Sequence, residues 1–126
     1  MQPIGPVIFG EILFDCFPDG SAVLGGAPFH VYVHLGRMGL NPLLITRVGE
    51  DARGADLLKA MRARGLSVEA VQRDSEHFKG EVVVSISDEG HPHFDIRPGQ
   101  AWDAIDGGEA LAVLADKQPS MLYCGT

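Results

Sequence analysis

Apolar residues follow two different periods along the first half of the chain. Residues 7–15, 43–48 and 68–71 are short apolar-rich runs and are predicted to be strands. Residues 28–39 and 52–64 carry apolar side chains at helical spacing and stop at a glycine, as helices often do. The first of these helices has apolar residues on most faces, so we expect it to be largely buried. The order strand, helix, strand, helix, strand predicts a mainly parallel sheet with right-handed crossovers.

The second half of the chain has a more polar pattern. Apolar and polar residues alternate in the runs 81–87 and 93–97, which flank the turn residues 88–90. This pattern predicts a β-hairpin with one face free to cover another part of the molecule. Residues 109–116 are predicted to form a short helix, and residues 121–126 a buried strand. Because the chain stops on an apolar strand that no helix follows, we expect it to be the N-terminal part of a longer α/β protein.

Composition narrows the classes of protein to be considered. The chain has 126 residues, 45% of them hydrophobic and 21% charged, so a single folded domain is expected. Its net charge of −7 argues against nucleic acid or an anionic membrane as a partner. No apolar run is long enough to span a bilayer, the N-terminus lacks the pattern of a signal peptide, and the chain has only two cysteines. We therefore expect a cytoplasmic protein.

A pair of glycines, Gly25 and Gly26, stands directly before the predicted start of a helix at Pro28. Without Cβ atoms, such a turn lets the backbone approach a ligand beside the positive end of a helix. Asp15 ends the first predicted strand, and open α/β sheets bind ligands at strand ends. Taken singly, Gly25-Gly26 could be a plain helix-entry turn and Asp15 a solvated acid. Together they indicate a ligand site.

Other motifs for metal or nucleotide chemistry are weak or missing. His30 and His34 are spaced i, i+4, which can bind zinc, but surface or core histidines are the more common explanation. The sequence has no G-x-x-x-x-G-K-[ST] loop, and no G-x-G-x-x-G follows the first strand, so neither common nucleotide fingerprint is present. No metal site is predicted.

Several motifs resemble the N-terminal signature of the ribokinase-like (PfkB) carbohydrate kinases. They are Gly10–Asp15, Gly25–Tyr32, Gly39 and Arg47–Gly54; the Gly10-Glu11 pair, Ala27-Pro28 and Ala101-Trp102-Asp103 are most similar to the fructokinase branch. The resemblance implies the N-terminal part of a ribokinase-like α/β fold, a mainly parallel sheet with flanking helices plus a β-hairpin lid. Residues 1–126 would then be a single incomplete domain with lid strands near 12–25 and 81–97, lacking the C-terminal ATP-binding part.

The resemblance also implies roles for single residues. Asp15 would accept hydrogen bonds from sugar hydroxyls, and Gly25 and Gly26 would let the backbone touch the sugar. His30 stands where the family has a sugar-binding Asn, and Arg97 would reach the substrate from the lid. The family transfers the γ-phosphoryl of Mg²⁺–ATP to a sugar hydroxymethyl group. ATP and Mg²⁺ are therefore expected in the full-length enzyme, but not bound by this chain alone.

The catalytic aspartate of such an enzyme would lie beyond Thr126, so we expect the chain alone to be inactive. A homodimer through the lid strands is also implied. Two departures, His30 and a bulky Tyr32 where the family has a small residue, keep an alternative open. The chain could be a noncatalytic binding or dimerisation module derived from this fold. A nucleoside or sugar-acid kinase of the same family is a further alternative.

Overall fold

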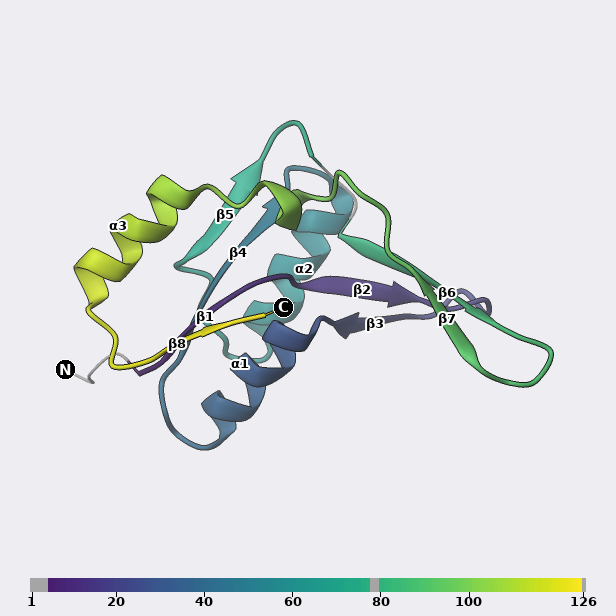
Figure 1. Ribbon diagram of the computed structural model, residues 1–126, viewed down its shortest axis with the longest axis horizontal. Helices are drawn as coiled ribbons and strands as arrows, with labels where there is room; N and C mark the ends of the chain where they lie inside the picture. The colour runs from purple at the N-terminus through teal and green to yellow at the C-terminus, as the bar shows by residue number, and fades with distance from the viewer. Residues whose placement is uncertain (1–4, 78–79, 126) are drawn as a thin grey trace.

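Two four-stranded sheets organise the chain, one inside a layered α/β core and the other projecting from it (Figure 1). The computed structural model describes residues 5–77 and 80–125. The core sheet has the order β5-β4-β1-β8 and is parallel throughout. The projecting sheet has the order β3-β2-β6-β7. The strands are β1 Val7–Phe9, β2 Leu13–Cys16, β3 Ala22–Gly25, β4 Leu43–Gly49, β5 Val71–Asp74, β6 Glu81–Ile86, β7 Pro92–Asp95 and β8 Leu122–Cys124.

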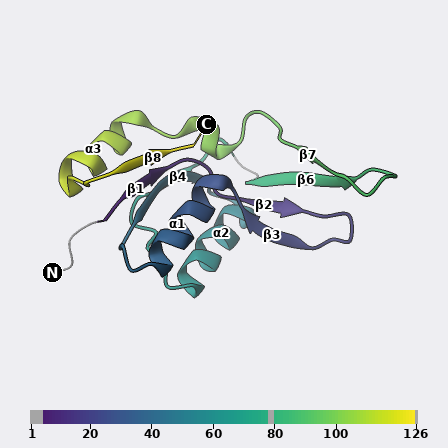
Figure 2. The same ribbon diagram turned by 60° about the horizontal axis from the view of Figure 1, so that its bottom comes forward.

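Helices cover both faces of the core sheet (Figure 2). Helices α1 (Ala27–Arg37) and α2 (Ala52–Ala63) lie on one face, and α3 (Gly107–Lys117) lies on the other. The alternation of side chains along each strand separates two apolar clusters: Ile8 and Leu44 pack toward α1 and α2, while the residues next to them pack toward α3. The predicted parallel sheet with flanking helices is confirmed. No helix among the described residues has the length and apolar character to cross a membrane.

The predicted strand over 7–15 is two strands that belong to different sheets. The chain leaves the core sheet after β1 and enters the projecting sheet at Leu13. The break falls at Gly10, whose φ is 156°, and a Cβ there would collide with the ring of Pro28. Only glycine fits such a position without strain, so the turn that separates the two sheets depends on it.

The projecting sheet combines two hairpins. β2 pairs antiparallel with β3 and parallel with β6, and β6 returns as β7, which confirms the predicted hairpin. Along β6, Val82 and Val84 are buried, whereas Val83 and Ser85 are exposed. This period of two is the pattern of a strand with one covered face. The hairpin therefore packs as part of a sheet and is not a free loop.

The third core strand lies later in the chain than predicted. The expected strand over 68–71 is mostly a turn, because the N–H of the first residue of β5 donates to the carbonyl of Val68. The strand itself is Val71–Asp74. Its polar composition conceals it from a search for apolar runs, although Gln72 and Asp74 are both buried. Their burial is compensated by hydrogen bonds, described below.

Two predictions of burial are wrong. In α1 only Pro28, Phe29 and Tyr32 are buried. Val31, Val33 and Leu35 are half-buried against the core, and the remaining side of the helix faces solvent. The expected strand at 121–126 exists as β8, but its three residues are exposed. β1 is its only neighbour among the described strands, so β8 is an edge strand of the core sheet. Thr126 lies outside the described residues.

Candidate functional site

The strand order reverses between β1 and β8. From β1 the chain runs through α1 to β4 on one side, while β8 adds to the other side beneath α3. At the carboxyl ends of these two strands, the N–H of Gly125, directly after β8, donates to the carbonyl of Phe9, the last residue of β1, over 3.3 Å. A Cβ on Gly125 would lie 3.0 Å from Cγ of Pro28, so the strand ends meet the start of α1. Open α/β sheets bind ligands at such a switch point.

Asp15 and Gly25 face one another across the β2–β3 pair. Leu13 pairs with Gly25 and Asp15 with Val23, which places all four on one face of the projecting sheet. A Cβ on Gly25 would come within 2.5 Å of the Asp15 Oδ2 atom. The carboxylate therefore occupies the space that a side chain at Gly25 would fill. Burial raises the pKa of Asp15, and the positive charge of His30 acts in the opposite direction.

Gly26 forms the entry to α1. It is the N-cap, with φ of 105° and ψ of 124°, and no side chain caps the helix. A Cβ on Gly26 would lie 2.8 Å from the carbonyl oxygen of Glu11, so only glycine allows this close backbone packing. Pro28 follows in the first turn, where its missing N–H is tolerated. The first turn also lacks an acidic side chain, so its positive end keeps its charge.

His30 lies on the exposed side of the first turn of α1. Its ring centroid is 5.9 Å from that of Phe29, at an interplanar angle of 59°. The imidazole is close enough for its charge to lower the pKa of Asp15. The structure therefore brings together four of the five predicted site residues: Asp15, Gly25, Gly26 and His30. That they bind a sugar stays a prediction.

Arg97 does not lie with this group. It follows β7, its side chain is 67% exposed, and its Nε donates to Asp95 Oδ2 over 3.1 Å. Asp95 pairs with Val83, and Val83 pairs with Cys16. Because paired residues share a face and neighbours alternate, Asp95 lies on the face opposite to Asp15. The role of Arg97 in substrate binding stays a prediction that this arrangement does not support.

Glu11 is a residue of this site that the sequence predictions left out. It is half-buried after β1, and its carbonyl packs against Gly26. Its carboxylate is also near the end of β8, since a Cβ on Gly125 would lie 3.9 Å from Glu11 Oε2. A charge inside the otherwise apolar run 7–15 was the signal that could have identified it.

The second signature segment, Arg47–Gly54, has a structural explanation. Arg47 Nε donates to Asp74 Oδ2 over 2.7 Å, which links β4 to β5. Asp51 caps α2 by accepting the N–H of Gly54 over 2.9 Å. A Cβ on Gly54 would collide with the carbonyl of Gly49. Packing and capping therefore account for the spacing of these residues without a ligand.

No metal-binding group is present within residues 5–77 and 80–125, where no three His, Cys, Asp or Glu side chains are placed to hold an ion. His30 and His34 are both exposed on α1.

The chain is similar to fructokinases in both sequence and structure. The fructokinase of Escherichia coli is 30% identical over 97 residues, which are 72% of this chain and 32% of that enzyme. The structure of Halothermothrix orenii fructokinase matches with a TM-score of 0.79 at 25% identity, over 96% of this chain and 46% of that one. Xylella fastidiosa fructokinase with bound ATP matches with a TM-score of 0.77 at 22% identity, over 94% of this chain and 38% of that one. No protein-family model matches the chain. The chain spans about a third of the length of the curated relatives it matches.

Proposed function

We propose that this chain, a homologue of the fructokinases with the fold of the ribokinase-like (PfkB) sugar kinases, is the sugar-binding and lid portion of an ATP-dependent carbohydrate kinase. One observation carries the proposal. The Asp15 carboxylate lies over Gly25, at the junction of the two sheets and next to the uncapped start of α1. A carboxylate beside glycine backbone, which carries no side chains, suits a ligand with many hydroxyl groups, because a carboxylate accepts several hydrogen bonds at once.

Each residue of this group has a distinct part in holding the sugar. Asp15 in its ionised form accepts hydrogen bonds from sugar hydroxyls. Gly25 and Gly26 keep the backbone free of side chains where the sugar approaches. His30 offers one nitrogen that donates and one that accepts, and it adds positive charge when it is protonated. The position of His30 makes it the residue most suited to determine which sugar is preferred.

The projecting sheet would act as the lid of this site. Its strands leave the core beside Asp15, so a movement of the sheet toward the switch point would enclose the sugar and exclude water. Phosphoryl transfer is mainly positioning and electrostatic stabilisation of charge. We assign the binding of Mg²⁺ and ATP, and the catalytic aspartate, to the remaining two thirds of such an enzyme. The chain alone should therefore bind sugar without turning it over.

A panel titration tests this proposal. The chain is titrated by calorimetry with D-fructose, D-glucose, D-ribose, a nucleoside and a sugar acid, and is then incubated with Mg²⁺–ATP and each compound. We expect saturable binding of a hexose and no product. Saturable binding of only the nucleoside or the sugar acid would move the chain to another branch of the family. Failure of every compound to bind would contradict the proposal, and turnover would contradict the assignment of catalysis to other residues.

Gly25→Ala is expected to weaken sugar binding about tenfold or more, because hydrogen bonds to a charged group contribute roughly 1.5–3 kcal/mol each. The added Cβ would lie 2.5 Å from Asp15 Oδ2, so the carboxylate must move from its place. Gly107→Ala is the matched control, since a Cβ at Gly107 meets nothing within 4 Å. The dissociation constant and the thermal midpoint of both variants are measured. Unchanged affinity in Gly25→Ala would show that Asp15 does not contact the sugar.

A second candidate function is supported by apolar side chains exposed on both faces of the projecting sheet. Val23, Ile86 and Phe94 lie on the face that holds Asp15, and Val83 lies on the opposite face; all four are between 46% and 55% exposed. Exposed apolar surface at open sheet edges favours pairing with a second chain. We propose a homodimer through these strands, compatible with the kinase assignment. Concentration-dependent dimerisation with no sugar binding would instead favour a noncatalytic module.

A further inference from the structure

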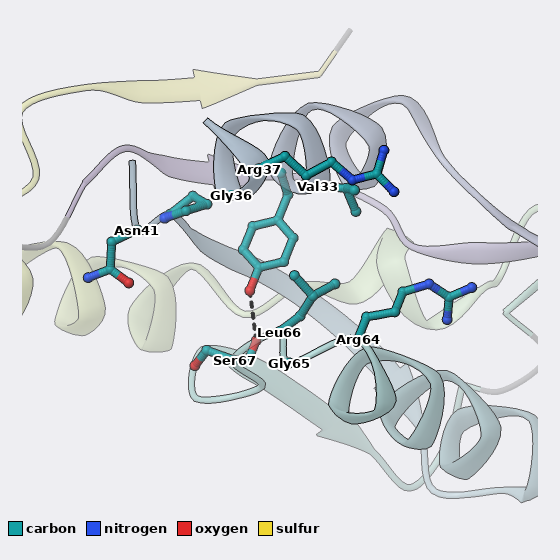
Figure 3. Close-up of a pocket in the computed structure, with 10 residues that line it drawn as sticks. Val33, Gly36, Arg37, Asn41, Arg64, Gly65, Leu66 and Ser67 are labelled. Atoms are coloured by element: carbon teal, nitrogen blue, oxygen red, sulfur yellow. Dashed lines mark hydrogen bonds between the residues drawn. The ribbon is translucent and has the colours of Figure 1, made fainter. Parts of the chain in front are cut away.

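A cavity of about 490 Å³ lies apart from the group around Asp15, between the second half of α1 and the turn that follows α2 (Figure 3). Its volume is within the range of roughly 300–1,000 Å³ that holds small organic ligands. None of the predicted site residues lines it. The lining comes from α1, from the loop before β4 and from the end of α2 with its following turn, and it includes Tyr32, Val33, Arg37, Arg64, Leu66 and Ser67.

The charged lining of this cavity is entirely basic. Arg37 and Arg64 are its only charged residues, and Figure 3 shows both guanidinium groups on the same side, beyond Val33 and Leu66. Neither arginine forms an ion pair with a carboxylate of the described residues; Arg64 donates only to the carbonyl of Ala60, over 3.1 Å. In a chain with a net charge of −7, two neighbouring guanidinium groups without acidic partners are a local positive site.

Another part of the lining is apolar. Tyr32 is 1% exposed, and its hydroxyl donates to the carbonyl of Ser67 over 3.1 Å, shown as the dashed line in Figure 3. This hydrogen bond joins α1 to the turn after α2 and fixes the ring against the cavity. Val33 and Leu66 add aliphatic surface.

We propose that this cavity binds a small organic phosphate monoester. Arg37 and Arg64 would hold the phosphate, and the organic part would lie against Val33 and Leu66. A phosphate monoester carries a charge of about −1.5 to −2 at neutral pH, which two guanidinium groups can neutralise. Its oxygens also match the planar donor geometry of arginine. This site is separate from Asp15 and does not depend on the proposed sugar-binding function.

Phenyl phosphate is the probe that tests this site, because it combines a phosphate monoester with a small apolar group. We expect saturable binding by calorimetry, and amide shifts in the NMR spectrum at residues 65–67. Arg37→Gln and Arg64→Gln should each weaken binding about tenfold or more, since each removes a charge-assisted interaction. Arg62→Gln is the matched control, because Arg62 is exposed in the last turn of α2 and does not line the cavity. The Arg62→Gln variant should bind phenyl phosphate as tightly as the unmodified chain does. Thermal midpoints confirm that each variant is folded.

Other ligands in the same titration separate the parts of the proposal. Phenol should bind at least tenfold more weakly than phenyl phosphate, and affinity for phenyl phosphate should fall with added salt. Equal affinity for benzoate would overturn the choice of a phosphate. Equal affinity for inorganic phosphate would overturn the role of the apolar wall. Unchanged binding of phenyl phosphate to the Arg37→Gln/Arg64→Gln double variant would overturn the site itself. Binding of sugars is measured separately and has no bearing on these outcomes.

Discussion

Asp74→Ala is expected to lower the free energy of unfolding by about 3 kcal/mol, because it leaves the charge of Arg47 without its main partner. Asp74 is 3% exposed in β5, and its Oδ2 accepts the Nε–H of Arg47 over 2.7 Å. The side chain of Arg47 is 19% exposed and keeps a longer contact of 3.5 Å to Glu109. This remaining contact and partial hydration hold the expected loss near the lower end of the range for buried pairs.

Asp74 also holds the turn that follows β5. Its Oδ1 accepts the backbone N–H groups of Glu76 and His77, over 2.8 and 2.9 Å. Its Oδ2 lies 3.0 Å from Nδ1 of His77. Alanine removes all of these acceptors, so the turn between the core sheet and the projecting sheet should loosen together with the ion pair. Urea denaturation measures the free energy of unfolding, and Asp88→Ala, in the exposed hairpin turn, is the control.

The same residue makes stability depend on pH. Burial raises the pKa of Asp74, but the hydrogen bonds from Arg47, Glu76 and His77 outweigh it and hold that pKa well below its usual range. A folded-state pKa below the unfolded value of about 3.9 stabilises the fold above the unfolded pKa, and this contribution is lost as the pH falls. The difference in stability between the unmodified chain and Asp74→Ala should therefore shrink below about pH 4. A difference that stays constant down to pH 3 would contradict this account.

The fold could be predicted where local pattern and tertiary structure agree. β4, α1 and α2 were found because apolar residues at the right period are enclosed by turn glycines: Gly39 and Gly65 have φ of 80° and 71° and follow the two helices. β5 could not be found in this way. Its buried residues Gln72 and Asp74 are polar, and partners distant in sequence compensate their burial: Arg47 of β4 bonds to both, and Asp106 bonds to Gln72.

The candidate site, like the fold, could be predicted from the sequence only in part. The sequence placed Asp15 near the glycine turn, at the end of a strand of the core sheet, but Asp15 lies in β2 of the projecting sheet. That Gly25 lies opposite Leu13, and that the carboxylate fills the space above Gly25, depends on the register of β2 and β3. Register also places Asp95, the hydrogen-bond partner of Arg97, on the face opposite to Asp15. A shift of one residue moves a side chain to the other face of a sheet, and composition cannot fix that choice.

Asp15→Asn is expected to weaken binding of a sugar about 100-fold, because hydrogen bonds to a charged acceptor contribute roughly 1.5–3 kcal/mol each and two of them would be weakened. The substitution keeps the shape of the side chain. It should not lower the free energy of unfolding, since burial penalises the ionised form of Asp15 and raises its pKa. Calorimetric titration with the sugar identified by the panel, together with a urea denaturation curve, separates loss of binding from loss of structure. Unchanged affinity would remove Asp15 from the site.

The pH profile of sugar binding tests whether Asp15 acts through its charge. Since burial raises the pKa of Asp15, binding should fall with decreasing pH, and it should do so at a higher pH than for an unshifted aspartate. The positive charge of His30 partly offsets that rise, so His30→Asn should move the acid limb of the profile to higher pH. His34→Asn, one turn further along the exposed side of α1, is the control and should leave the limb in place. An acid limb that His30→Asn does not move would show that the imidazole does not act through the ionisation of Asp15.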